Sequence, residues 1–408
     1  MERATFTIMD AEGPKGTTSR ATFAPWPSYD ATEIEAVTRV LQSGRVNYWT
    51  GDEGRSFEAE YARSVGRSFG IALANGSVAL ELALHAFGIG HGDEVITTSR
   101  TFIASASAAV MRGATPIMAD VDRDSQNVTV TSLERCLTPR TRALVVVHLA
   151  GWPCDMPQIM RFAEAHDLTV IEDCAQANGA AIDGRPVGSF GDAAAWSFCQ
   201  DKIITTGGEG GMLTLEDEDA WQRAWSHKDH GKSYEAVFHR EHPPGFRWLH
   251  ESFGTNWRMT EPQAAIGRLQ LAKLEDTITT RRRNAEILLD GFAGLPALRL
   301  TIPPAHVRHA YYKLYAFIVP EALRTGWDRD RVMTTILGEG VPCFSGSCGE
   351  IYRELAFQRA DLGPPQRHPV AVELGETSLM FLVHPTLSEE ALAHTVDTVR
   401  HVITAATR

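Results

Sequence analysis

The chain has 408 residues, of which 43% are hydrophobic, and a formal net charge of −12 at pH 7. This length exceeds one ordinary core and indicates two domains, or one large domain with a smaller one beside it. Nucleic acids and anionic membranes attract clustered Lys and Arg, so the acidic balance argues against a general affinity for either and favours small-molecule ligands.

The six cysteines are scattered, without a CxxC pair or a dense framework. Such spacing predicts free thiols in a reducing compartment, and we expect no metal site. The first twenty residues carry charges and lack the apolar run of a signal peptide, and no apolar run reaches the length of a membrane span. We therefore expect a cytoplasmic protein.

The N-terminal part is predicted to hold an arm and one helix. Residues 1–28 show no clear periodicity and are expected to form the arm. Asp30 followed by Glu33 has the signature of a helix capping box. The buried face of this helix is expected at the apolar positions Ile34, Val37, Val40 and Leu41. The next loop holds Tyr48 and Trp49, which either line a pocket or cover the edge of a core.

From about residue 70, short apolar runs alternate with helical stretches, as in a doubly wound sheet. The expected strands are 71–74, 94–97, 116–120, 144–147, 169–172, 193–198 and 212–215. Several are continuously apolar, which is typical of parallel strands covered by helices on both faces. We predict an α/β fold with a mostly parallel seven-stranded sheet in a large domain (29–285) and a smaller C-terminal α/β domain (286–408).

Residues 215 to about 255 are charged and aromatic, and Pro243-Pro244-Gly245 is incompatible with regular structure. We expect a long loop that reaches a neighbouring subunit or covers a site. Residues 260–289 are predicted to be helical, with Arg281-Arg282-Arg283 on a solvated face. The C-terminal domain is expected to hold strands at 314–319 and 378–382 and helices near 328–338 and 388–404.

The stretch from Glu172 to Gly211 brings together candidate catalytic residues. Asp173 follows a strand, and Lys202 precedes a glycine cluster that lacks the GxGxxG spacing of a nicotinamide-dependent oxidoreductase. Taken singly, these residues could be a helix cap, a solvated lysine and a turn. Taken together, an aspartate can keep a ring nitrogen protonated, a nearby serine can bond a phosphate and the lysine can form a Schiff base with an aldehyde. These requirements match pyridoxal phosphate.

Over nearly its whole length the chain resembles the DegT group of sugar aminotransferases, which are fold-type-I pyridoxal-phosphate enzymes. The matching stretches are ANGSVALELALHAFGIGHGDEVITTSRTF (74–102), GATPIMADVD (113–122), HLAGWPCDM (148–156), VIEDCAQANGA (170–180), GSFGDAAAWSFCQDK (188–202), GEGG (208–211) and NWRMTEPQAAIGRLQL (256–271).

The resemblance implies roles for individual residues. Lys202 is expected to form the Schiff base with the cofactor and to move the substrate α-proton, while Asp173 holds the pyridine nitrogen protonated. The other implied cofactor contacts are Gln176 at the phenolic oxygen, Phe102 on the ring face, Gly76, Ser77 and Ser197 at the phosphate, and Asn256 at the phosphate of the partner subunit. The implied substrate residues are Arg258, for a carboxylate or other anion, and Tyr48, Trp49, His309, Tyr311 and Lys313. A homodimer with two shared sites follows.

The resemblance also implies a reaction. We expect transfer of an amino group, with L-glutamate as donor, to a keto or aldehyde group of a nucleotide-linked deoxy-sugar, for surface polysaccharide or secondary-metabolite biosynthesis. A dehydratase branch of the family replaces the lysine by histidine, so Lys202 favours transamination. The stretch 340–357 departs from many relatives and leaves a cyclitol or an eight-carbon keto-sugar acid open as acceptor. A non-catalytic regulatory protein of the same fold remains an alternative of another class.

Overall fold

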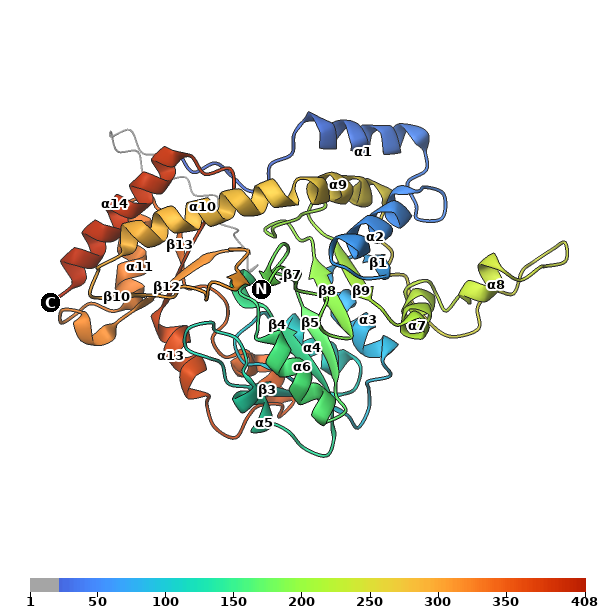
Figure 1. Cartoon of the computed structure of the whole chain (residues 1–408), viewed down its shortest axis with the longest axis horizontal. Helices are drawn as coiled ribbons and strands as arrows, with labels where there is room; N and C mark the ends of the chain where they lie inside the picture. Colours follow the sequence, from blue (N-terminus) through green and yellow to red (C-terminus); the bar gives the residue numbers. More distant parts are fainter. Residues whose placement is uncertain (1–21) are drawn as a thin grey trace, which may run out of the picture.

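The computed structural model describes residues 22–408, so most of the predicted arm lies outside the described part (Figure 1). A seven-stranded sheet has the order β1-β9-β8-β5-β4-β2-β3. Its strands are β1 (Phe69–Leu73), β2 (Glu94–Thr98), β3 (Thr115–Ala119), β4 (Thr141–Val147), β5 (Thr169–Asp173), β8 (Ala193–Ser197) and β9 (Gly211–Leu215). All neighbours are parallel except the two pairs made by β9. The predicted fold class and all seven strands are confirmed, with ends that differ by a few residues.

Helices cover both faces of this sheet because its strands are apolar on both. Ala143 and Val145 of β4 face one layer, whereas Leu144 and Val146 face the other. The first layer contains α3 (Gly76–Ala86), α4 (Ala104–Met111) and α7 (Glu218–Lys228). The second contains α2 (Glu53–Ser64), α5 (Val130–Glu134), α6 (Met156–Ala165) and α9 (Glu261–Ala272).

The C-terminal part builds a second, antiparallel sheet in the order β10-β12-β14-β13. Its strands are β10 (Leu298–Leu300), β12 (Leu314–Ile318), β13 (Cys343–Phe344) and β14 (Ser378–Phe381), and its main helices are α10 (Leu274–Phe292), α11 (Arg329–Gly338) and α14 (Glu389–Ala406). The smaller elements are β6 (Ala181–Ile182), β7 (Arg185–Pro186), β11 (Val307–Arg308), α8 (Tyr234–Phe238), α12 (Leu355–Arg359), α13 (Pro369–Thr377), η1 (Leu149–Gly151), η2 (Pro320–Ala322) and η3 (Ile351–Arg353). The predicted strands and helices of this part are confirmed.

Helix α10 runs unbroken through the predicted domain boundary at residue 285 (Figure 1). Its buried residues extend from Ile278, which packs beneath the large sheet, to Phe292, which packs in the core of the small sheet. The division of the chain at this point therefore stays a prediction.

The predicted buried face of the first helix, α1 (Ala31–Ser43), is partly wrong. The capping box is present, but Ile34 and Leu41 are 61% and 59% exposed. The helix instead turns Glu33 inward, where its carboxylate accepts hydrogen bonds from Gln270 and from Lys273, at 2.7 and 2.6 Å. These polar bonds to α9 and its end set the rotation of α1 and leave two large apolar side chains uncovered.

The predicted long loop is shorter than expected, because residues 218–228 form α7. Asp217 caps this helix through a 2.6 Å bond from the backbone N–H of Ala220, and Ala224 and Trp225 pack on the large sheet. The irregular part comes after α8 and projects from the body of the molecule (Figure 1). It carries three exposed aromatic residues, Phe246, Trp248 and Phe253.

Arg281 does not lie on a solvated face, contrary to the prediction. It is fully buried in α10 and donates hydrogen bonds to the backbone carbonyls of Tyr311 and Tyr312, at 3.4 and 3.2 Å. Its charge sits among carbonyl dipoles and over the ring of Trp26, with 5.0 Å between Cζ and the ring centroid. Burial lowers the pKa of Arg281 to about 10, which leaves it charged at neutral pH.

The six cysteines are all free in the structure, as predicted. Across residues 22–408, no helix combines the length and the apolar character that a membrane crossing requires.

Candidate functional site

The predicted cofactor residues meet where strands of the large sheet end. Asp173 is the last residue of β5 and Ser197 the last residue of β8, and α3 starts at Gly76 shortly after β1. These three strands run in the same direction, so their carboxyl ends lie at the same end of the sheet. Ligands of open α/β sheets bind beyond the carboxyl ends of the strands.

Asp173 is a buried carboxylate, only 5% exposed. One oxygen accepts a 2.7 Å hydrogen bond from the Ser105 hydroxyl, and the other accepts a 3.2 Å bond from the backbone N–H of Ala175. Burial raises the pKa of Asp173 above its usual value. Both donors are neutral, so a ligand that brings a protonated nitrogen to this carboxylate would supply the missing positive charge.

Ser105 was not predicted from the sequence. It is one serine of the run Ala104-Ser105-Ala106-Ser107, and nothing in that run separates it from Ser107. Only the fold, which brings α4 beside the end of β5, identifies it as the partner of Asp173.

The N-terminus of α3 forms a cradle suited to an anion. Asn75 caps the helix through a 3.0 Å bond from the backbone N–H of Val78. A Cβ atom at Gly76 would lie 2.7 Å from the Cβ of Ser197, so the close approach of helix and strand requires glycine. Free backbone N–H groups and the helix dipole favour a phosphate at this position, beside Ser77 and Ser197.

Gln176 and Phe102 flank the same strand ends. The side-chain oxygen of Gln176 accepts a 2.8 Å hydrogen bond from the backbone N–H of Ala150. Phe102 follows β2 and is 66% exposed, an unusual state for a phenylalanine. Its ring is available to pack on a planar ligand.

Lys202 lies in the loop between β8 and β9, with a largely buried side chain. Its Nζ is 3.4 Å from the hydroxyl oxygen of Tyr312 and 3.6 Å from Oδ1 of Asp201. The Tyr312 hydroxyl in turn donates a hydrogen bond to Oδ2 of Asp201. Neither Asp201 nor Tyr312 was predicted, although each adjoins a predicted residue in the sequence.

Lys313, a predicted substrate residue, lies close to this group. Its Nζ is 4.8 Å from the centroid of the Tyr312 ring, as is the Nζ of Lys202. Burial lowers the pKa of Lys313 to about 8, while Asp201 opposes the shift. With a pKa of about 8, Lys313 still carries mainly its positive charge at neutral pH.

Three other predicted residues, Tyr48, Trp49 and Arg258, form a second cluster around buried charges. The indole of Trp49 and the guanidinium of Arg258 both donate to Asp229, at 2.7 and 2.6 Å. The Tyr48 hydroxyl donates to Glu58 at 3.1 Å. Internal partners thus hold all three side chains in this structure.

The segment that carries Asn256 and Arg258 runs beside the end of β1. Leu73 and Arg258 form a β-bridge, and the backbone N–H of Ala74 donates to the carbonyl of Trp257 at 2.9 Å. Asn256 is exposed. Its side chain therefore has room for a contact with a second molecule.

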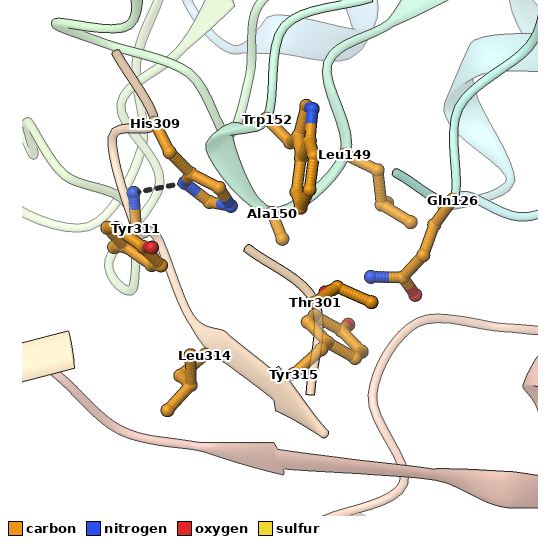
Figure 2. Close-up of a pocket in the computed structure, with 9 residues that line it drawn as sticks. All are labelled: Gln126, Leu149, Ala150, Trp152, Thr301, His309, Tyr311, Leu314 and Tyr315. Carbon is orange, nitrogen blue, oxygen red and sulfur yellow. Dashed lines mark hydrogen bonds between the residues drawn. The ribbon is translucent and has the colours of Figure 1, made fainter. Parts of the chain in front are cut away.

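His309 and Tyr311 line a small cavity between the two sheets, together with Gln126, Leu149, Ala150, Trp152, Thr301, Leu314 and Tyr315 (Figure 2). The two rings stack at 3.9 Å, and His309 Nδ1 accepts a 2.8 Å bond from the backbone N–H of Tyr311. Burial lowers the pKa of His309 to about 3, so the imidazole is neutral. The cavity volume of about 10 Å³ admits no more than one water, and a sugar ring does not fit.

One group of possible metal ligands occurs among residues 22–408, namely His148, Glu172 and Cys174. His148 Nδ1 accepts from the backbone N–H of Cys154, and its Nε2 donates to Glu172, both at 3.0 Å. Glu172 also accepts from three backbone N–H groups at residues 188, 190 and 191. These bonds occupy the group and explain its burial without a metal ion.

The sequence and the fold match those of known aminotransferases. A sequence model of the DegT/DnrJ/EryC1/StrS aminotransferase family matches residues 27–400. A UDP-N-acetyl-3-dehydro-α-D-glucosamine 3-aminotransferase of Acidithiobacillus ferrooxidans is 36% identical over 387 residues, which are 94% of this chain and 96% of that protein. An aminotransferase structure from Psychrobacter cryohalolentis has a TM-score of 0.92 at 53% identity and covers 94% of this chain and 100% of its own. DesV of S. venezuelae, solved with a ketimine intermediate, has a TM-score of 0.82 at 32% identity, with coverage of 91% and 94%.

Proposed function

The chain belongs to the DegT/DnrJ/EryC1/StrS family of pyridoxal-phosphate-dependent aminotransferases, and we propose that it moves an amino group from L-glutamate to a keto group of a nucleotide-linked sugar. The observation that carries the proposal is that a buried carboxylate without a direct salt bridge, Asp173, and a largely buried lysine, Lys202, both lie at the carboxyl ends of the large-sheet strands. A sugar acceptor is favoured by the similarity over nearly the whole chain to an enzyme named for a UDP-linked sugar.

The residues present fit the cofactor. The Asp173 carboxylate would hold the ring nitrogen, because its hydrogen bonds come from neutral donors. The phosphate would rest on Gly76 and Ser77 at the start of α3, with the Ser197 hydroxyl beside it. Phe102 would cover the ring, and Gln176 would lie near its phenolic oxygen.

When bound, pyridoxal phosphate supplies an electron sink that stabilises the negative charge left by loss of a proton. The chain's own groups do the rest. Lys202 anchors the aldehyde carbon, and its amine, once released, removes the α-proton of the donor and returns a proton during product formation. The Asp173 carboxylate keeps the ring nitrogen protonated through a charge-assisted hydrogen bond.

Arg258 and Lys313 are the proposed anion-binding residues for the substrates. Tyr48, Trp49, His309 and Tyr311 are the other proposed substrate residues, and a sugar would reach His309 and Tyr311 only if the small cavity that they line opened. In the structure Asp229 neutralises Arg258, so a substrate carboxylate would have to compete with it. Lys313 has no such direct salt bridge, and its amine lies 4.8 Å from the centroid of the Tyr312 ring, as does the Lys202 amine. It is therefore the better placed of the two cations.

The acceptor class can be tested with 15N-labelled L-glutamate and a panel of keto compounds. We expect the label to appear, by mass spectrometry, in a UDP-, GDP- or dTDP-linked keto-sugar, with 2-oxoglutarate as the co-product. Transfer only to a cyclitol ketone or to an eight-carbon keto-sugar acid would replace the proposed acceptor. Absence of transfer to any acceptor, with a cofactor-free protein, would favour a regulatory role.

We further propose a homodimer in which Asn256 of one subunit binds the phosphate in the site of the other. Support comes from the exposed Asn256 and from apolar side chains left uncovered on α1 and on the projecting segment. Free thiols and the small-molecule substrates favour a cytoplasmic enzyme of surface polysaccharide or secondary-metabolite biosynthesis.

Mixing two inactive variants, Lys202→Ala and Asn256→Asp, tests the shared site. In a mixed dimer, one site would combine both defects, whereas the other would combine an intact lysine with an intact asparagine. We expect refolded or coexpressed mixtures to recover about a quarter of the wild-type activity, since half the dimers are mixed and each has one good site. If both residues serve the same subunit's site, mixing restores nothing.

A further inference from the structure

The amine of Lys202 lies beside a side-chain pair that the proposed mechanism does not use. The Tyr312 hydroxyl donates to the Asp201 carboxylate and accepts from the Lys202 amine, so it bridges the two charges. Tyr312 is only 7% exposed, and water offers it little competition. We refer to Asp201 and Tyr312 as the Asp–Tyr pair.

Both ends of this arrangement are fixed by the backbone. Tyr312 donates its N–H to the carbonyl of Ala150 at 2.9 Å and receives a bond from Arg281 on its own carbonyl at 3.2 Å. The carbonyl of Lys202 accepts a 2.8 Å bond from the indole of Trp26. The backbone positions from which the Tyr312 hydroxyl and the Lys202 amine project are therefore defined by these bonds.

The surrounding charges keep the Asp–Tyr pair polarised. Burial raises the pKa of Asp201, but attraction to Lys202, the Tyr312 hydrogen bond and Lys313 outweigh it and hold the pKa below its usual value. Asp201 is thus an anion at neutral pH. The other titratable groups that interact with this cluster are Arg281, Asp173, Cys199 and Tyr315.

We propose that Tyr312, held by Asp201, is a positioning residue for Lys202. Its hydroxyl accepts a hydrogen bond from the Lys202 amine, and so keeps this amine in place, whenever the amine is not bonded to the cofactor. The inference rests on the proposed function, in which each turnover releases and recaptures Lys202. A bare carboxylate 3.6 Å from the amine would favour its protonated form. By donating to that carboxylate and accepting from the amine, the Tyr312 hydroxyl weakens the direct attraction between the two groups.

Competitive acetylation of Lys202, followed by mass spectrometry across pH, tests the inference in the full-length protein after the cofactor has been removed. In Tyr312→Phe, the Asp201 carboxylate would pair with the amine without the intervening hydroxyl. The midpoint of the curve of Lys202 labelling against pH should therefore move up by about one pH unit, and labelling near pH 8 should fall severalfold. In Asp201→Asn the anion is lost, and the midpoint should move down. The two shifts have opposite signs, which a general loosening of the fold would not produce.

Tyr352→Phe is the matched control, because Tyr352 is also buried and also donates to a carboxylate, that of Glu350, but packs against β3 and α4. It should leave Lys202 labelling unchanged. Unshifted midpoints in both test variants, or equal shifts in one direction, would overturn the inference; if Tyr312→Phe does not fold, the shift of Asp201→Asn decides alone.

A second readout separates this inference from the proposed function. The loaded wild-type protein should show a visible absorbance band from the lysine-bound cofactor, and Tyr312→Phe, Asp201→Asn and Tyr352→Phe should show it as well. If the wild-type protein takes up no cofactor on Lys202, the proposed function fails. If the band is present but the labelling of Lys202 does not shift, only the role of the Asp–Tyr pair fails.

Discussion

Replacement of Lys202 by alanine is expected to abolish the visible absorbance band of the lysine-bound cofactor and to lower transamination by more than about 10³-fold. The lysine amine is both the anchor of the aldehyde and the proposed base for the donor proton. Its neighbours Asp201 and Tyr312 cannot form the same bond to an aldehyde. The measurements are an absorbance spectrum of the purified variant and a glutamate-dependent turnover assay.

Two further lysine variants sharpen this test. Lys202→Arg keeps a positive charge at the position and should be as inactive as the alanine variant, since a guanidinium does not replace the amine as base or anchor. Lys273→Ala removes a lysine that pairs with Asp30 and Glu33 at the surface of α1, and it should keep both band and turnover. An active Lys202→Ala enzyme would refute the assignment of the catalytic lysine.

Replacement of Asp173 by asparagine is expected to lower the rate of the glutamate half-reaction by about 10²–10³-fold while the protein still binds cofactor through its phosphate. The amide has nearly the same shape, but it lacks the charge that keeps a ring nitrogen protonated. Stopped-flow absorbance after mixing with glutamate would measure this rate, and the band before mixing would report the amount of bound cofactor.

Ser105 provides a graded comparison at the same carboxylate. Ser105→Ala removes one hydrogen bond from a neutral donor to this carboxylate, worth about 1.5 kcal/mol, and leaves the charge of Asp173 in place, so the rate should fall by only about tenfold. An Asp173→Asn variant that reacts as fast as Ser105→Ala would show that the charge at this position is not required.

Local patterns were sufficient to predict much of this fold. The strands of the large sheet are short, apolar and separated by helical stretches, and each of them was expected near its observed position. Since strand ends in such a sheet share one edge, the proximity of Asp173, Ser197 and Lys202 also followed from the sequence. The resemblance to a known family supplied what spacing did not, namely the proposed roles of Gln176, Phe102 and Asn256.

The failures share a physical cause, which is that polar residues are buried when the fold provides partners for them. The charge of Arg281 predicts a position at the surface, yet the side chain is buried and donates hydrogen bonds to the backbone carbonyls of Tyr311 and Tyr312. Glu33 is buried in the same way, and it displaces Ile34 from the expected inner face of α1. Such partners come from distant segments, so no periodicity in the local sequence could reveal them.

Helix α10 connects the cores of the two sheets to the backbone of Tyr312. The helix is 19 residues long, about 28 Å, and one end packs under the large sheet while the other packs against the small one. Through Arg281 it holds the backbone that carries Tyr312, whose hydroxyl meets the Lys202 amine. A tilt of the small sheet would therefore alter the distance between hydroxyl and amine, so a substitution in the remote core around Phe292 is able to change the reactivity of the lysine without touching it.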